Sequence, residues 1–252
     1  KIDMLDITGK TALVTGSGSG MGQGMAAQLA RQGAHVVVND IFSDKAEESA
    51  EAIRKAGGSA STSVFDVTDP EAIKKSIVEA DKQFGGIDIL VNNVGNAGAV
   101  QMEQVHFKDS DPKNWLKFVD VNLYGVMYCT HAVLPGMCDR GWGRVISISS
   151  GAGRTGLNIG VSIYGAAKAG SINLMRHISQ EVGKDGVTCN AIALGLMNTV
   201  PDEFAAPIIK TIPCGRLGTP EDAGSMVGFL ASEEANWITG QVFCVDGGSA
   251  PY

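Results

Sequence analysis

The sequence has no hydrophobic run that approaches the ~18 residues needed to cross a bilayer. Its first ten residues, KIDMLDITGK, have no apolar signal core. Its net charge is −7, and its 20 basic and 27 acidic residues are spread along the chain, which argues against a nucleic-acid or anionic-membrane surface. We therefore expect a cytoplasmic protein that binds neither nucleic acid nor membrane.

Signals for disulfides and metal sites are equally scarce. The five cysteines, at 129, 138, 189, 214 and 244, are odd in number, scattered and without a CxxC pair, so we expect reduced thiols. The four histidines are isolated and form no HExxH motif, which predicts no metal site and leaves a zinc-dependent dehydrogenase without support. No linker, repeat or low-complexity tract divides the chain, and 44% of it is hydrophobic. We expect one α/β domain over residues 1–252.

The clearest positive signal is a glycine-rich segment near the start of the chain. The run KTALVTGSGSGMGQGMAAQLARQGAHVVVND predicts a strand at 11–15, a helix at 21–32 and a strand at 34–38. Met21 stands where the G-x-G-x-x-G fingerprint needs its last glycine. The spacing Gly16-x-x-x-Gly20-x-Gly22 can fill the same role, because it lets the backbone approach a pyrophosphate at a helix N-terminus. Taken alone, the turn could also be only a flexible loop.

An acidic residue follows this unit and indicates the cofactor. Asp40 ends the second strand, eighteen residues after Gly22, where a carboxylate accepts hydrogen bonds from an adenosine ribose. The same charge would repel the 2′-phosphate of NADP, and no arginine or lysine occupies 17–19 or 41–43 to offset it. The sequence therefore predicts NAD as the cofactor.

A second pair of residues indicates alcohol chemistry. Tyr164 and Lys168 stand four residues apart in the run SIYGAAKAG, and the strand-like GRVISISSGAG upstream ends in the hydroxyls of Ser149 and Ser150. On a helix, this spacing puts phenol and ammonium on one face, where the positive charge would lower the pKa of the tyrosine. Tyr164 is then a candidate proton donor and acceptor. The spacing alone also fits two surface neighbours.

The remaining segments alternate between strand and helix. We expect further strands at 64–67 (which Asp66 ends), 87–92, 144–149, 187–192 and 241–245, and helices at 70–84, 115–137, 164–184 and 220–230. This alternation predicts a Rossmann-type doubly wound parallel sheet of about seven strands with helices on both faces. Ligands of such sheets bind beyond the carboxyl ends of the strands, where the unusual glycines, acids and hydroxyls of this chain lie.

Five motifs together resemble the short-chain dehydrogenase/reductase family over residues 9–248: TGSGSGMG, NNVG, VNLYG, YGAAK and VDGG. The resemblance implies that Tyr164 is the acid/base, that Lys168 binds the nicotinamide ribose, that Ser150 orients the substrate oxygen and that Asn122 holds a water in a proton relay. It also implies a homotetramer. The expected cofactor-binding set is Gly16, Ser19, Gly20, Met21, Gly22, Asp40, Ile41, Asp66, Val67, Asn93, Gly95, Tyr164, Lys168 and Thr199.

The chain departs from the family pattern at three points. Gly151 stands at the usual place of the serine, thirteen residues before the tyrosine, so aligning SSGAGRTG selects Ser150 and leaves one extra residue in the loop 157–163. Ser149 points to the opposite face of the strand and would then be a satisfied core group. Leu194 replaces the usual proline after the sixth strand, and Val94 replaces the usual alanine of the asparagine motif.

The substrate is indicated by a segment that resembles the mobile substrate lid of the family, residues 195–213. It carries the apolar residues Leu196, Met197, Val200, Phe204, Ile208 and Ile209, which could line a pocket or pack inward. Arg154 and His106 could reach a carboxylate or a carrier group, but we expect both at the solvated surface. With no cationic clamp, the prediction is an NAD-dependent dehydrogenase or reductase of a hydrophobic secondary alcohol or ketone, such as a cyclic alcohol, steroid or aryl ketone.

Two alternative functions and one assembly question stay open. A 3-oxoacyl thioester reductase would be expected to prefer NADPH and a basic docking surface for an acidic carrier. A non-catalytic NAD-binding sensor could lose Tyr164, Lys168 or Ser150, and all three are present. The apolar residues Trp115, Phe118, Val126 and Met127 could serve either a tetramer interface or the core.

Overall fold

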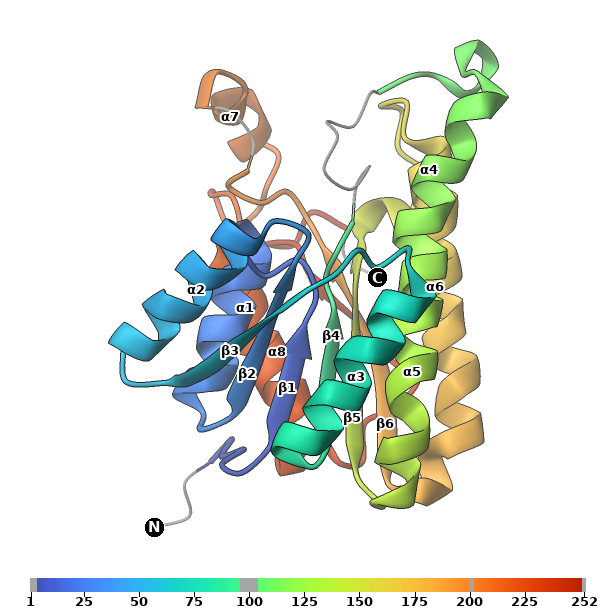
Figure 1. The fold of residues 1–252 in the computed structure, drawn as a ribbon. Coiled ribbons are helices and arrows are strands. Elements are labelled where there is room, and N and C mark those ends of the chain that lie inside the picture. The colour runs from blue at the N-terminus through green and yellow to red at the C-terminus, as the bar shows by residue number, and fades with distance from the viewer. Residues whose placement is uncertain (1–3, 96–103, 200–201, 251–252) are drawn as a thin grey trace.

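Seven parallel strands form a single sheet in the order β3-β2-β1-β4-β5-β6-β7 in the computed structural model (Figure 1). The structure describes residues 4–95, 104–199 and 202–250, without the side chains of 202–204. The strand order reverses between β1 and β4, which creates the crevice where doubly wound sheets bind ligands. The strands are β1 (Thr11–Val14), β2 (His35–Asp40), β3 (Ser59–Val64), β4 (Ile89–Asn92), β5 (Gly143–Ser150), β6 (Val187–Leu194) and β7 (Val242–Val245).

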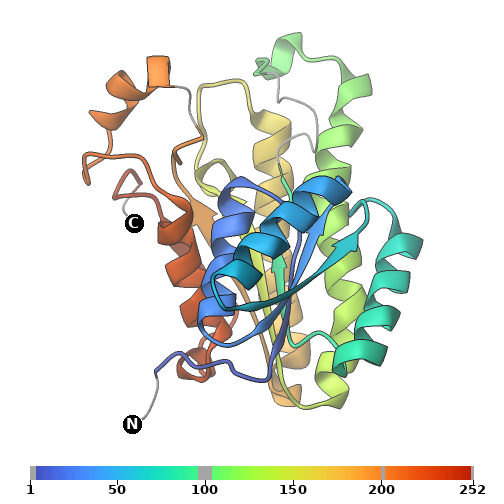
Figure 2. The same ribbon diagram turned by 60° about the vertical axis from the view of Figure 1, so that its left-hand side comes forward.

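Helices cover both faces of the sheet (Figures 1 and 2). On one face α1, α2 and α8 bury their apolar sides, and on the other α3, α5 and α6 do so. None of the described helices is long and apolar enough to cross a membrane. The helices are α1 (Gly20–Arg31), α2 (Ser43–Lys55), α3 (Pro70–Phe84), α4 (Trp115–Val119), α5 (Gly125–Asp139), α6 (Ser162–Val182), α7 (Asp202–Ile209) and α8 (Pro220–Ala231).

The buried apolar residues form two clusters, one on each face of the sheet. In β1, Ala12 and Val14 belong to one buried cluster and Leu13 to the other, because successive side chains of a strand point to opposite faces. The central strands β4, β5 and β6 are buried along almost their whole length, with both faces covered by helices. This confirms the predicted fold class.

Two predicted elements need correction, and one helix was missed. The third strand is Ser59–Val64, earlier than the predicted 64–67, because its run SASTSV lies at the sheet edge and needs no large apolar side chains. Helix α2 was not predicted, since it buries only Ala46, Ser49, Ala50 and Ile53 and gives a weak apolar pattern. The long helix predicted at 115–137 is interrupted by a π-helical segment, Asp120–Tyr124, between α4 and α5.

Two segments stand beyond the carboxyl ends of the strands. Helix α7 follows β6, and the start of α4 follows β4 on the other side of the crevice (Figure 1). Because β-strands that run parallel end at the same edge, the residues that follow β1, β2, β4 and β5 gather between these two segments.

Candidate active site

The glycine-rich turn between β1 and α1 is shaped for a phosphate group. Gly16 and Gly20 have φ of +61° and +59°, which a residue with a side chain rarely adopts. A Cβ on Gly22 would lie 2.3 Å from the carbonyl oxygen of Gly16, so only glycine allows the helix to start this close to the turn. Ser19, the N-cap of α1, makes no side-chain capping bond, which leaves the N–H groups of the first turn available to an anion. The turn therefore fits the pyrophosphate of a dinucleotide.

Asn93, directly after β4, fixes this turn. Its Nδ2 donates to the carbonyl oxygens of Thr15 (2.9 Å) and Gly16 (3.0 Å), and its backbone N–H donates to Thr15 Oγ1 (3.0 Å). The family resemblance places Asn93 in the expected cofactor-binding set, and in the structure its amide group holds the glycine-rich turn. Gly95 lies nearer the tyrosine and lysine pair, since a Cβ there would be 2.9 Å from Lys168 Nζ.

The carboxylate of Asp40 closes the other side of the turn. Its Oδ2 accepts the backbone N–H of Gly18 at 3.3 Å, and its Oδ1 accepts that of Phe42 at 3.1 Å. Ile41, between the two, is exposed. These bonds hold the carboxylate at the carboxyl end of β2, where its remaining acceptor capacity suits a ribose diol.

The other predicted cofactor residues occupy varied positions. Asp66 is exposed, and its Oδ1 accepts the backbone N–H and the hydroxyl of Thr68, both at 2.8 Å. Val67 is buried in the core beside Gly125, so its side chain does not face a ligand. Met21 is half-buried against the core, and Thr199 is exposed in the turn after β6.

Tyr164 and Lys168 share one face of α6, which begins at Ser162. Lys168 is 3% exposed, and its Nζ donates to the carbonyl oxygen of Ile148 at 2.9 Å. The same Nζ lies 5.8 Å from the centroid of the Tyr164 ring. Burial lowers the pKa of Lys168 to about 8, because the charged ammonium is removed from water.

This geometry corrects the expected effect of the lysine on the tyrosine. Burial raises the pKa of Tyr164, and a hydrogen bond with Ser150 offsets part of that rise by favouring the phenolate. The ammonium of Lys168 is engaged by the Ile148 carbonyl instead of the phenol oxygen. In the protein without a cofactor, burial therefore has a larger effect on the pKa of Tyr164 than the charge of Lys168 has.

The two adjacent serines at the end of β5 have different surroundings. Ser150 hydrogen-bonds Tyr164, and its Oγ accepts the backbone N–H of Ala152 at 3.2 Å. Ser149 is 3% exposed, and its hydroxyl donates to the carbonyl oxygen of Lys168 at 3.1 Å. Alternation along the strand thus turns Ser150 toward the tyrosine and Ser149 into the packing between sheet and helix.

Asn122 lies in the π-helical segment beside this group. It is fully buried, and its Nδ2 donates to the carbonyl oxygen of Phe118 at 2.9 Å. A Cβ on Gly95 would meet both Asn122 Oδ1, at 3.3 Å, and Lys168 Nζ, at 2.9 Å, so these groups surround the same point. π-Helical turns often occur at functional sites. No sequence pattern predicted this one.

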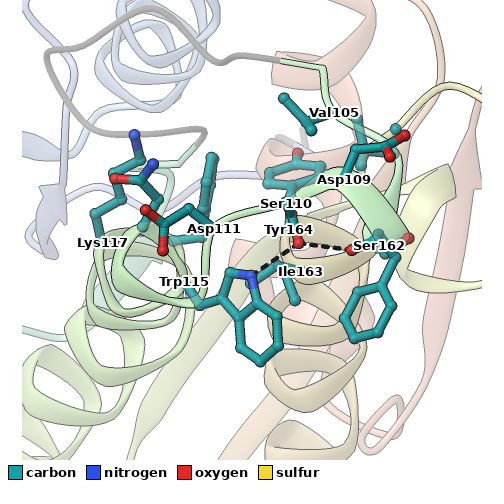
Figure 3. A pocket seen from close by; sticks show the side chains of 14 residues that line it. Val105, Asp109, Ser110, Asp111, Trp115, Lys117, Ser162, Ile163 and Tyr164 are labelled. Carbon is teal, nitrogen blue, oxygen red and sulfur yellow. Dashed lines mark hydrogen bonds between the residues drawn. The ribbon is translucent and has the colours of Figure 1, made fainter.

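A cavity of about 200 Å³ opens beside Tyr164 (Figure 3). One wall is a stacked pair, Phe107 and Trp115, with ring centroids 5.3 Å apart. The indole N–H of Trp115 donates to Ser110 Oγ at 3.0 Å, and that hydroxyl donates to the carbonyl oxygen of Phe107 at 2.8 Å. The lining comprises Val105, Phe107, Asp109, Ser110, Asp111, Asn114, Trp115, Lys117, Phe118, Gly160, Val161, Ser162, Ile163 and Tyr164.

This cavity was not predicted as a substrate site. Trp115 and Phe118, predicted to serve the core or an interface between subunits, both line the cavity. An aromatic cluster at the start of the helix after the fourth strand could have indicated it. Val126, in contrast, is a core residue, and Met127 is 39% exposed.

The segment predicted as a lid has a mixed character. Met197 is a core residue that bridges to Gly218, whereas Leu196 is 42% exposed. Ile208 and Ile209 are half-buried on α7. Val200 and the side chain of Phe204 lie outside the described residues.

The two surface candidates do not reach the cavity wall. Arg154 is exposed and donates a hydrogen bond to Cys244 Sγ. His106 is also exposed. Within the described residues, no three His, Cys, Asp or Glu side chains gather where they could hold a metal ion.

Residues 16–250 match the family model described as enoyl-(acyl carrier protein) reductase. An oxidoreductase of Mycobacterium tuberculosis is 41% identical over 245 residues, which are 95% of this chain and 96% of that protein. The 3-oxoacyl-[acyl-carrier-protein] reductase of Haemophilus influenzae is 37% identical, over 95% and 98% of the two chains.

Two further similar proteins are named for alcohol oxidation. The 7alpha-hydroxysteroid dehydrogenase of Bacteroides fragilis is 33% identical, over 95% of this chain and 93% of that protein. The crystal structure of a gluconate 5-dehydrogenase from Burkholderia cenocepacia, in complex with NADP and tartrate, has a TM-score of 0.90 and 31% identity, over 98% and 97% of the two chains.

Proposed function

The chain belongs to the short-chain dehydrogenase/reductase family, and from this premise we propose that it is an NAD-dependent oxidoreductase that interconverts a secondary alcohol and a ketone. The observation that carries the proposal is the position of Tyr164. Its phenol hydrogen-bonds Ser150, shares a helix face with Lys168 and lines the cavity. A proton donor is thus placed where a substrate oxygen can enter.

The groups that would hold the cofactor extend from the glycine-rich turn to Lys168. The turn and the N-terminus of α1 would bind the pyrophosphate, Asp40 the adenosine ribose and Lys168 the nicotinamide ribose. Ile41, Asp66, Gly95 and Thr199 would complete the site through exposed side chains or backbone groups. When bound, NAD supplies the hydride acceptor.

Tyr164 would move the proton. Burial keeps the phenol protonated at neutral pH, which suits donation to a carbonyl oxygen during ketone reduction. In the opposite direction the phenolate would take the alcohol proton, favoured by the Ser150 hydroxyl and by the ammonium of Lys168. Ser150 would also orient the substrate oxygen. Asn122 would hold the water through which Lys168 exchanges protons with solvent.

The cavity supports a mainly hydrophobic substrate. Aromatic and aliphatic side chains form most of its wall near Tyr164, notably Phe107, Trp115 and Val161. Its volume of about 200 Å³ suits a single-ring alcohol or aryl ketone better than a four-ring steroid. Asp109, Asp111 and Lys117 add polar groups to the lining, where they could contact substituents of the ring.

Reduction of a 3-oxoacyl thioester with NADPH is the second candidate. It is favoured by the similarity to the 3-oxoacyl reductase of Haemophilus influenzae. The carboxylate of Asp40 opposes it, because that charge would lie against the 2′-phosphate of NADPH.

A panel of reactions followed by NADH absorbance tests the proposal. Cyclic alcohols and aryl ketones should react with NAD or NADH faster than a 3-oxoacyl thioester reacts with NADPH. Tyr164→Phe keeps the ring but removes the proton, so turnover should fall by ~10² to 10⁴ while NADH still binds. Near-normal turnover of this variant would remove Tyr164 from the mechanism. A thioester preferred with NADPH would establish the second candidate.

A further inference from the structure

The first turn of α2 packs against the glycine-rich turn, next to Asp40. A Cβ built on Gly18 would lie 2.7 Å from Asp40 Oδ2 and 2.9 Å from Lys45 Cβ. The distance between Asp40 Oδ2 and Lys45 Cβ therefore cannot exceed the sum of 2.7 Å and 2.9 Å. Asp40 and Lys45 flank the same backbone segment of the turn. Only a glycine at position 18 leaves room for both.

The ammonium of Lys45 is available to an anionic ligand. Lys45 is exposed, and its Nζ lies 4.9 Å from the ring centroid of Phe42, whose backbone N–H donates to Asp40 Oδ1. In residues 4–95, 104–199 and 202–250, no carboxylate forms an ion pair with it. The four-carbon stem of a lysine lets its ammonium swing over several ångströms from a fixed Cβ.

The two charges would act in opposite directions on the adenosine ribose. Asp40 favours the free hydroxyls of NAD and repels the 2′-phosphate of NADP. A lysine anchored beside that carboxylate attracts the phosphate but gains little from an uncharged hydroxyl. Positions 17–19 and 41–43 carry no basic residue, but Lys45 comes close to Asp40 because α2 folds back onto the turn.

We infer that Lys45 is a second determinant of cofactor choice, an inference that rests on the proposed dinucleotide site. Its ammonium pairs with the 2′-phosphate of NADP and so reduces the preference for NAD that Asp40 imposes. Lys45 is a specificity-determining residue and takes no part in the transfer of hydride or proton.

Binding of NADH and NADPH, followed by nucleotide fluorescence at low ionic strength, tests this role without a substrate. Lys45→Ala should raise the Kd of NADPH about three- to tenfold, the effect of losing one exposed charge pair, and leave that of NADH within about twofold. Lys55→Ala is the matched control. It removes the same charge from the same helix, about 15 Å farther along its axis, and should change neither Kd.

A double-mutant cycle makes the test independent of how weakly the wild type binds NADPH. Asp40→Ser removes the repulsion, so NADPH should bind more tightly. Adding Lys45→Ala should remove most of that gain. The effect of Lys45 should also shrink at high salt, because the pair is exposed to solvent.

The outcomes separate this inference from the function on which it rests. A selective loss of NADPH affinity in Lys45→Ala supports the role of Lys45. Equal changes for both nucleotides, or none in either background, overturn it while the dinucleotide site stands. If neither wild type nor Asp40→Ser binds either nucleotide, the proposed function fails, and the inference fails with it.

Discussion

The Nζ atom of Lys168 lies 5.8 Å from the centroid of the Tyr164 ring, held by a hydrogen bond to the carbonyl oxygen of Ile148. The ammonium is almost fully buried, and within the described part of the chain its hydrogen bond goes to this neutral acceptor. Burying a charge in this way disfavours the folded state. Lys168, which we propose takes part in the chemistry, is therefore expected to reduce the stability of the nucleotide-free protein.

Lys168→Met should stabilise the nucleotide-free protein while turnover is lost. The folded pKa of about 8, against an ordinary value of 10.5, corresponds to about 3 kcal/mol of destabilisation at neutral pH. The methionine variant removes this cost and keeps most of the packing, so its Tm at pH 7 should rise. Thermal unfolding measures the difference, with the exposed Lys184→Met as the control that should leave Tm unchanged.

The pH dependence of this stabilisation has a definite sign. Below pH 8 the lysine is protonated in both the folded and unfolded chains, so the penalty is complete. Between pH 8 and 10.5 the unfolded chain binds more protons than the folded one, and the stability of the wild type rises with pH. The advantage of Lys168→Met should therefore shrink over this window. An advantage that stays constant would mean that packing, not the buried charge, causes it.

Ser150→Ala and Ser149→Ala should separate catalysis from packing. Ser150 hydrogen-bonds the phenol of Tyr164, so its loss should lower kcat and shift the pH profile upward, because that bond favours the phenolate. Ser149 donates to the backbone of α6, so its loss should lower the free energy of unfolding by about 1 kcal/mol, as is typical of one buried hydrogen bond, and lower Tm accordingly. Steady-state kinetics and thermal unfolding of both variants give the comparison. The reverse ranking in kcat would reassign the catalytic hydroxyl.

The fold was predictable where side chains alternate or repeat strongly. Strands β4, β5 and β6 are rich in buried aliphatic residues, and the glycine-rich turn is limited to glycine by close backbone approach, so both leave a clear pattern. Helix α2 packs through alanine and serine, and β3 is an edge strand with few apolar residues. Neither has the hydrophobic contrast that sequence periodicity detects.

The sequence predicted which residues belong to the candidate site, but not the pKa of Tyr164 or the approach of Lys45 to Asp40. Motifs identified Tyr164, Lys168 and Asp40, because their spacing depends on local structure. The pKa of Tyr164 depends on how deeply the folded chain buries the phenol. The position of Lys45 beside Asp40 depends on how α2 packs against the glycine-rich turn at Gly18. Such contacts depend on how the chain folds back, which spacing alone does not describe.

We also propose a homotetramer, with an exposed aromatic pair in one interface, at the junction of the π-helical segment and α5. Tyr124 and Tyr128 stack with ring centroids 6.1 Å apart, and both are about 40% exposed beside the exposed Met127. Replacing both tyrosines by lysine should place like charges across a two-fold axis and release smaller species. Light scattering checks this. A wild type that scatters as a single 26.2 kDa species would refute the tetramer.

A backbone contact across the cavity mouth gives the last prediction. The N–H of Val105 donates to the carbonyl oxygen of Gly160 at 2.9 Å, and both residues line the cavity. Gly160 has φ of +72°, and a Cβ there would lie 2.7 Å from Val105 N. Gly160 belongs to the loop that carries the extra residue before Tyr164. Its hydrogen bond with Val105 therefore fixes this loop to the opposite wall segment of the cavity.

Gly160→Ala should break that contact and loosen the wall without touching Tyr164. We expect KM to rise severalfold for small ketones, while bulkier ketones gain relative activity and kcat changes little. Gly141→Ala is the matched control, because Gly141 has a similar φ of +68° but nothing within 4 Å of its Cβ. Both variants bear the strain of a side chain in the left-handed region, about 1–2 kcal/mol, and Gly160→Ala also loses the hydrogen bond to Val105, so its loss of Tm should be the larger of the two. If the two variants share one kinetic profile, backbone strain alone is at work, and the loop does not shape the substrate site.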